Sequence, residues 1–317
     1  MNNPLPVIST PAIRGSRPLK NHVDFRVPYA FLVEQELSSS RTLDSVATVF
    51  LTNRECPFHC LMCDLWKNTT DESVPVGAIP AQIDYALSRL PPAQHIKLYN
   101  SGNFFDRRAI PPDDYSAIIE RVRTFQTVII ENHPRFCTEE CVRFRDLLGT
   151  ELEVAVGLET IHPQVLPRLN KGMTLDEYER AVRFLISHGI SVRTFVLVRP
   201  PFLNEEDGVE WAIRSVEFAL DLGVRCCAVI PTRGGNGIME QLRLAGQFQP
   251  PSIVSLEQVL ERLLASQPDG RIFADLWDVD QFYNCQRCGA RRASRIQQMN
   301  ETQSIPPAVK CDCESAR

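Results

Sequence analysis

Six short apolar runs recur along the chain, and each is followed by polar or turn-forming residues. Several runs are continuous rather than alternating, such as Val-Ile-Ile at 128–130, which is typical of strands buried on both faces of a parallel sheet. The pattern therefore predicts six strands, at residues 46–52, 95–100, 127–132, 152–159, 191–199 and 224–231.

Segments with helical spacing separate these runs. Residues 175–188 place apolar side chains on one helical face and end at Gly189, a residue type that commonly follows a helix. Residues 205–222 and 256–264 have a similar pattern. The alternation predicts an α/β fold, a partial (β/α)6 barrel of parallel strands. A doubly wound open sheet is the alternative, because both folds place chemistry at the carboxyl ends of the strands.

The pattern divides the chain into three predicted parts. Residues 1–45 contain several prolines, have weak periodicity and are expected to form an N-terminal extension. Residues 46–277 would form the barrel. From residue 278 the strand–helix alternation stops, so we expect residues 278–317 to form a small cysteine-rich metal-binding module.

Composition excludes several classes of protein. Hydrophobic residues make up 44% of the 317 residues and charged residues 23%, as in soluble globular proteins. No apolar run approaches the roughly 18 residues of a membrane span, and the N-terminus lacks the apolar region of a secretory signal. We therefore expect a cytoplasmic protein without membrane contact. The net charge of -5 argues against nucleic-acid binding over the whole surface.

The chain contains eleven cysteines, and three of them lie on one predicted loop directly after the first strand. Cys56, Cys60 and Cys63 have the spacing C-x3-C-x2-C. In a cytoplasmic protein, clustered cysteines indicate metal ligands rather than disulfides. Three thiolates can hold three irons of a [4Fe–4S] cluster and leave the fourth iron open to a ligand. A zinc site with His59 as fourth ligand is the alternative.

This loop resembles the signature of the radical S-adenosylmethionine (SAM) superfamily, with Met62 at the apolar position beside the adenine. The resemblance implies a [4Fe–4S] cluster whose open iron chelates SAM. It further implies that the reduced cluster cleaves SAM to a 5′-deoxyadenosyl radical, which abstracts hydrogen from a substrate. The protein would orient SAM and exclude water.

Polar residues at the other strand ends agree with this resemblance. The turn Asn100-Ser101-Gly102-Asn103 stands where the superfamily binds the amino group of SAM, although position 103 lacks the family's usual acid. Glu159 is a candidate for the ribose or the ammonium group, and Arg199 for the carboxylate, which a guanidinium matches in two-point contact. The candidate catalytic residues, expected to touch the substrate, are Glu131, Lys171 and Arg233.

Residues 45–265 are also similar to the archaeosine-biosynthesis radical SAM enzymes, relatives of the Elongator catalytic subunit. The similarity rests on Val-Gly-Leu-Glu-Thr160, Asn170-Lys-Gly172 and Val-Arg-Pro-Pro-Phe-Leu203, among other motifs. It implies cleavage of a C–N bond in a lysine-like adduct on a tRNA base or nucleobase, with a flavodoxin or ferredoxin as reducing partner. The alternatives are a radical SAM methylthiotransferase or maturase, and a non-catalytic zinc- or RNA-binding module.

A second cysteine group lies near the C-terminus and comprises Cys285, Cys288, Cys311 and Cys313. Four thiolates in two close pairs could bind zinc or a second [4Fe–4S] cluster, and the C-x-C half favours the cluster. Residues 281–317 contain six basic and three acidic residues, which suits a phosphate backbone. The candidate phosphate contacts are Arg287, Arg291, Arg292 and Arg295.

Overall fold

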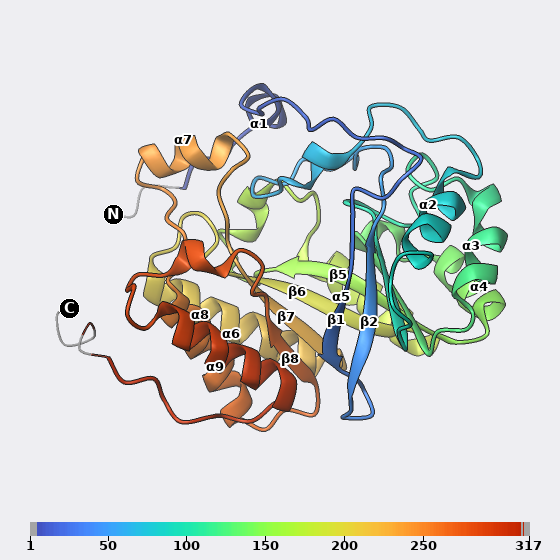
Figure 1. Ribbon diagram of the computed structural model, residues 1–317. Coiled ribbons are helices and arrows are strands. Elements are labelled where there is room, and N and C mark those ends of the chain that lie inside the picture. Colours follow the sequence, from blue (N-terminus) through green and yellow to red (C-terminus); the bar gives the residue numbers. More distant parts are fainter. Residues whose placement is uncertain (1–4, 312, 314–317) are drawn as a thin grey trace.

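A single curled sheet of eight strands forms the centre of the computed structural model, which describes residues 5–311 and 313 (Figure 1). The strands are arranged in chain order, with β1 and β8 at the two edges. Strands β2 to β8 are parallel, whereas β1 pairs with β2 in the antiparallel direction. The strands are β1 (Ala30–Leu37), β2 (Leu43–Phe50), β3 (His95–Tyr99), β4 (Thr127–Asn132), β5 (Glu151–Glu159), β6 (Ser191–Val198), β7 (Cys226–Pro231) and β8 (Arg271–Ala274).

Helices cover the outer face of the sheet, so that the structure is a half-barrel. α2, α3 and α4 lie on one side of it, and α6, α8 and α9 on the other (Figure 1). The helices are α1 (Thr10–Gly15), α2 (Ala78–Leu87), α3 (Tyr115–Val122), α4 (Glu139–Leu148), α5 (Leu175–Ser187), α6 (Glu205–Asp221), α7 (Ile238–Leu244), α8 (Ile253–Ala265) and α9 (Gly289–Thr302). Within the described part of the chain, no helix has the length and apolar character needed to cross a membrane.

The predicted partial barrel is confirmed, and all six predicted strands are present as β2 to β7. The strand count was too low, because the sheet also contains β1 and β8. β8 has only four residues, Arg-Ile-Phe-Ala, which is too short for a recognisable pattern. β1 carries Glu34 and Glu36, whose charges hide its strand character in the sequence.

Both terminal segments pack on the barrel. β1 comes from the predicted N-terminal extension, and α9, from the predicted C-terminal module, contacts β1, β8 and α8. Ile296 and Met299 of α9 are buried in the main core. The domain boundaries at residues 45 and 277 stay predictions. The N-terminal and C-terminal parts nevertheless both pack against the barrel, and α9 contributes to its main core.

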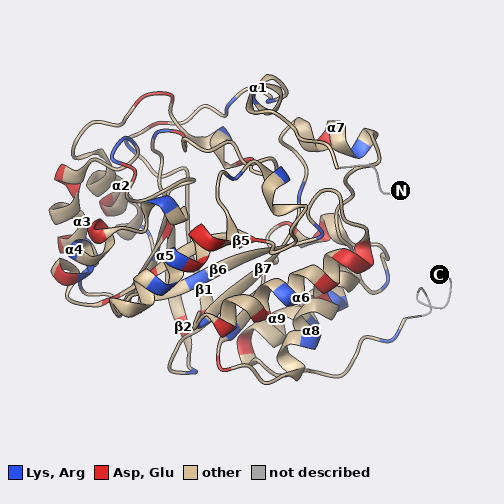
Figure 2. Ribbon diagram, turned by 180° about the vertical axis from the view of Figure 1, so that it is seen from behind, with Lys and Arg blue, Asp and Glu red and all other residues tan. Residues whose placement is uncertain are grey.

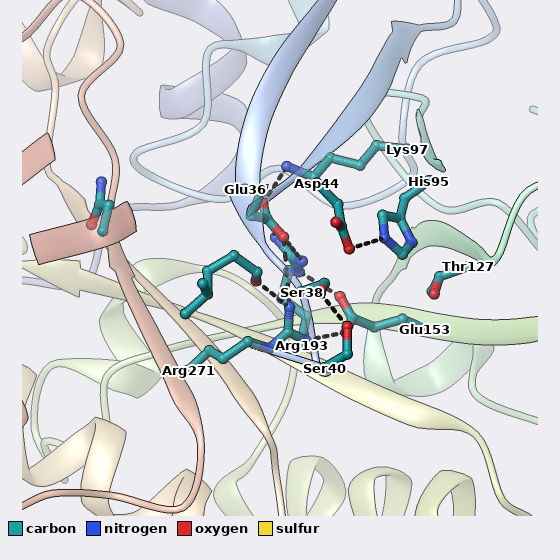
Figure 3. Close-up of polar contacts among 12 residues, drawn as sticks. Glu36, Ser38, Ser40, Asp44, His95, Lys97, Thr127, Glu153, Arg193 and Arg271 are labelled. Carbon is teal, nitrogen blue, oxygen red and sulfur yellow. Dashed lines mark hydrogen bonds and ion pairs between the residues drawn. The ribbon is translucent and has the colours of Figure 1, made fainter. Parts of the chain in front are cut away.

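A network of buried charges closes the amino-terminal end of the parallel strands (Figure 3). The Arg193 guanidinium lies 2.6 Å from Glu153 and 2.5 Å from Glu36, and Lys97 lies 2.6 Å from Glu36. Arg271 on β8 bonds Glu153 at 3.2 Å. These contacts join β1, β3, β5, β6 and β8 across the interior, and the cavity that remains among them, about 20 Å³, has room for about one water molecule. At this end of the barrel the described side chains therefore leave no room for a larger ligand.

Candidate active site at the carboxyl ends of the strands

The cysteine loop leaves β2 at the carboxyl edge of the sheet and is held by segments that are distant in sequence. The backbone N–H of Leu61 donates to the Leu169 carbonyl at 2.7 Å. The Asn236 amide donates to the carbonyls of Leu61 and Cys63 at 2.8 and 3.1 Å. Met62 packs against the buried cluster that contains Leu197, and its predicted place beside the adenine stays a prediction. These contacts fix the loop from two other strand ends.

The geometry of the three thiols differs from that of a single-ion site. Burial raises the pKa of Cys56, Cys60 and Cys63 to about 12. Among the described residues, the four C-terminal thiols, and not these three, form a group placed to hold a single metal ion. His59, the fourth ligand of the zinc alternative, instead places Nδ1 3.3 Å from the Arg17 guanidinium. The loop therefore fits a cluster with three protein ligands better than a zinc ion.

The turn after β3 lies directly against this loop. A Cβ atom on Gly102 would be 3.3 Å from Cβ of Cys56, so the two backbones approach closely. Asn103 donates from Nδ2 to the sulfur of Cys56 at 3.3 Å and accepts the backbone N–H of His133 at 2.6 Å. The missing acid at position 103 thus has a physical explanation, because a carboxylate could not donate to the sulfur.

We expect Asn103→Asp to make the reduction potential of the cluster more negative. The substitution removes an N–H···S hydrogen bond, which stabilises the reduced cluster, and adds a negative charge. A redox titration followed by electron paramagnetic resonance measures the potential. Asn132→Asp is the matched control. The amide nitrogen of Asn132 also lies near a cysteine sulfur, 4.0 Å from that of Cys141, but Cys141 is not in the cysteine loop. An unchanged potential in Asn103→Asp would contradict the role of this hydrogen bond.

Glu131, on β4, holds the same turn. Its Oε1 accepts the backbone N–H groups of Asn100 and Gly102 at 2.7 and 3.3 Å. Burial raises the pKa of the Glu131 carboxyl to about 6, against the lowering effect of these hydrogen bonds. The observed contacts are those of a positioning residue, and contact of Glu131 with a substrate stays a prediction.

Two observations indicate that this edge of the sheet is built for a polar ligand. Both side-chain polar atoms of Asn100 are buried without a hydrogen-bond partner. Ser101, Glu159 and Arg199, at three strand ends, have φ values of 54°, 67° and 54°. This left-handed conformation costs roughly 1–2 kcal/mol for each residue that has a Cβ atom. Such strain is concentrated at functional sites, and the residues present fit SAM.

Glu159 and Lys171 form a buried ion pair beside the cysteine loop. Their charged atoms are 2.7 Å apart, and each side chain is about 10% exposed. Burial is the largest single influence and would lower the pKa of Lys171, but the Glu159 carboxylate together with Cys60 and Cys56 outweighs burial and raises it. A Cβ atom on Gly157 would collide with the Glu159 carboxylate and lie 2.6 Å from the Lys171 nitrogen. Glycine at position 157 therefore makes room for the pair.

Arg199 and Arg233 lie farther around the edge. Arg199 donates to the Pro250 carbonyl at 2.9 Å and leaves its Nε buried without a partner, so it can still donate to a carboxylate. Arg233 pairs with Asp275 at 2.8 Å. Within residues 5–311 and 313, the hydrogen bonds and ion pairs of these two arginines do not reach the cysteine loop. Their predicted roles stay predictions.

Sequence reasoning missed a row of aromatic side chains inside the barrel. The Tyr99 ring on β3 lies 6.1 Å from Phe50 and 6.3 Å from Phe195 on β6, and Tyr29 lies 5.6 Å from Phe50. Since β4 and β5 separate β3 from β6 in the sheet, the Tyr99–Phe195 contact must cross the interior. All four rings are only partly buried. The sequence did contain a signal for this row. Tyr99 and Lys97 are two positions apart on one strand, as are Phe195 and Arg193 on another, so each ring points to the same face as a buried charge.

Comparison with known proteins agrees with this geometry. Residues 50–213 match the radical SAM superfamily. This chain belongs to the radical SAM superfamily. The match spans the cysteine loop and the ends of β2 to β6, which carry the predicted SAM contacts. Membership confirms the predicted resemblance, makes the chain a radical SAM enzyme, and implies a [4Fe–4S] cluster and SAM as cofactors.

Two proteins of similar sequence and one solved structure of similar fold can be compared with this chain. This superfamily member is 24% identical over 315 residues to a protein of Methanocaldococcus jannaschii described as uncharacterized, covering 92% of this chain and 86% of that protein. It is 26% identical over 270 residues to archaeosine synthase subunit beta of Methanosarcina acetivorans, covering 80% of this chain and 77% of that subunit. The solved structure of archaeal Elp3 from Methanocaldococcus infernus has a similar fold, with a TM-score of 0.51 and 15% identity over 68% of this chain and 58% of Elp3.

Proposed function

We propose that this radical SAM enzyme modifies tRNA, by cleaving a C–N bond in a lysine-like adduct of a deazaguanine base to leave an amidine. The observation that carries the proposal is the similarity to archaeosine synthase subunit beta over 77% of that subunit's length. The motifs at 156–160 and 170–172, on which the resemblance rests, form the buried Glu159–Lys171 pair beside the cysteine loop.

The predicted site residues would have two roles, holding the cluster and binding SAM. Cys56, Cys60 and Cys63 would hold the cluster, and Asn100, Ser101, Gly102, Asn103, Glu159, Arg199 and Met62 would bind and orient SAM. When bound, the [4Fe–4S] cluster and SAM supply the hydrogen-abstracting radical. The strand ends and the apolar cluster around Met62 would exclude water from it.

The aromatic row would bind the base. A flat heterocycle stacks on aromatic rings with about 1–3 kcal/mol per base, and Tyr99 and Phe195 expose part of their rings between the charged network below and the SAM-binding turn above. The lysine-like part of the adduct would then extend toward Glu131, Lys171 or Arg233. A flavodoxin or ferredoxin would supply the electron.

The direct test is single-turnover chemistry on tRNA. The anaerobically reconstituted enzyme, reduced with dithionite, receives SAM and a tRNA that carries the lysine–deazaguanine adduct. We expect 5′-deoxyadenosine in proportion to an amidine nucleoside, detected by mass spectrometry after nuclease digestion. The same tRNA without the adduct is the control. Equal 5′-deoxyadenosine with both tRNAs and an unchanged adduct would contradict the proposal, and transfer of a methylthio group would establish the methylthiotransferase alternative instead.

Phe195→Ala is expected to lower product formation on the adduct tRNA by about 5- to 150-fold, the range that corresponds to loss of one stacking contact. SAM binding should be unchanged, because no predicted SAM contact involves this ring. Phe184→Ala is the matched control, since Phe184 is a partly buried aromatic residue on α5 outside the barrel interior. Equal effects on product formation and SAM affinity would indicate general damage to the barrel.

A further inference from the structure

The four C-terminal thiols are placed close enough together to hold one metal ion. Cys285 and Cys311 have their sulfur atoms 3.9 Å apart, and Cys288 and Cys313 have theirs 3.6 Å apart. All four sulfur atoms lie within 4.8 Å of one another, and no other group among the described residues does so. The thiols therefore surround a volume that is sized for one atom.

The distances distinguish between the two kinds of metal centre that the sequence left open. In a tetrahedral zinc site each Zn–S bond is about 2.3 Å, which places neighbouring sulfurs about 3.8 Å apart. In a [4Fe–4S] cluster the thiolates lie outside a cube of irons and sulfides and cannot come into contact with one another. The C-terminal distances match the single ion.

The site joins two segments that already lie side by side. Cys288 is buried and immediately precedes α9, while Cys311 and Cys313 lie on the tail that runs back along this helix (Figure 1). Arg295 on α9 donates to the Pro306 carbonyl at 2.8 and 3.0 Å, and Arg291 donates to the Lys310 carbonyl at 3.5 Å. A metal at the far end of the tail would close a loop that contains all of α9.

The helix inside this loop is in turn anchored to the barrel. Arg292 and Arg295 are 4% and 6% exposed, and both pair with the buried carboxylate of Glu257 on α8. This corrects the prediction that these two arginines contact phosphate, because their charge is already compensated inside the protein. Basic and acidic residues are interspersed on α6, α8 and α9 (Figure 2). Arg292 and Arg295 therefore support the fold, whereas Arg287 and Arg291 are exposed and their contact with phosphate stays a prediction.

We propose that Cys285, Cys288, Cys311 and Cys313 bind a single zinc ion, which clamps the C-terminal tail to α9. Four protein ligands leave no open position on the ion, and zinc has no redox chemistry, so the site is structural. The enzyme would then contain one cluster, and electrons would enter only at the Cys56–Cys60–Cys63 loop. This inference does not depend on the proposed tRNA substrate.

Metal analysis of the full chain tests the proposal. We expect about one zinc and about four irons per chain after anaerobic purification and reconstitution. The Cys285→Ser/Cys311→Ser variant should lose the zinc and keep the iron. The reciprocal control, Cys56→Ala/Cys60→Ala/Cys63→Ala, should lose the iron and keep the zinc. Zinc-edge X-ray absorption of the wild type should show only sulfur neighbours, at about 2.3 Å.

A chelator experiment keeps the test valid if the C-terminal variant fails to fold. Removal of zinc from the wild type should make trypsin cut after Lys310 while the iron content stays constant, because the clamp is lost and the barrel is not. About eight irons and no zinc in the wild type would overturn the proposal, and so would a single iron with four sulfur ligands. Unchanged protection of Lys310 after zinc removal would overturn the clamp.

Discussion

Cys60→Ala is expected to abolish 5′-deoxyadenosine formation and to remove the iron bound at the N-terminal loop. Three thiolates from one loop would hold three irons, so loss of the middle ligand would leave two protein bonds for the whole cluster. Burial raises the pKa of the Cys60 thiol, and the charge of Lys171 is the largest influence that opposes this rise. No other thiol can substitute, because the remaining cysteines outside the loop lie in the core or in the C-terminal site.

The measurement is iron content together with chromatographic detection of 5′-deoxyadenosine after reduction with dithionite. Cys226→Ala is the matched control. Cys226 is fully buried with Leu37 and Phe273, away from the cysteine loop, so its removal should leave iron and activity in place. Normal 5′-deoxyadenosine formation in Cys60→Ala would rule out the proposed ligand set. Loss of activity with unchanged iron would assign Cys60 a role other than metal binding.

The parts of the fold that the sequence predicts are those with local causes. β4 and β6 contain continuous apolar runs, at residues 128–130 and 195–198, because both faces of these runs are covered, and this composition is visible without the structure. The cysteine loop was equally readable, because three thiols on one short segment have few structural alternatives. Ser101, Glu159 and Arg199 could be located because a strand end followed by a polar residue is also a local feature.

The parts that the sequence does not predict depend on distant partners. Glu36 looks like a solvated charge on a weak strand until Arg193 and Lys97, 157 and 61 positions away, are seen to surround it. Arg292 and Arg295 looked like exposed basic residues of a helix because Glu257 is 35 and 38 positions away. The same limit applies to the aromatic row, in which Tyr99 and Phe195 meet only because the sheet curls. Charge and ring pairings across a barrel are absent from any local pattern.

Breaking the buried ion pair of Glu159 and Lys171 is expected to destabilise the fold strongly. We expect Lys171→Met to lower the free energy of unfolding by about 3–5 kcal/mol, because it leaves the Glu159 carboxylate buried without its counter-ion. Denaturant unfolding of the metal-free chain measures this loss. Gly15→Ala is the control for general damage, since a Cβ atom at position 15 meets no atom within 4 Å.

The double substitution Glu159→Gln/Lys171→Met separates the two roles of the pair. Removing both charges should restore most of the stability, because no unpaired charge is left in the core. SAM binding to the cluster-loaded enzyme should be weaker than in the wild type, since an uncharged amide replaces the carboxylate that is predicted to contact SAM. If SAM binding recovers together with stability, the pair only supports the fold, and Glu159 does not contact the cofactor.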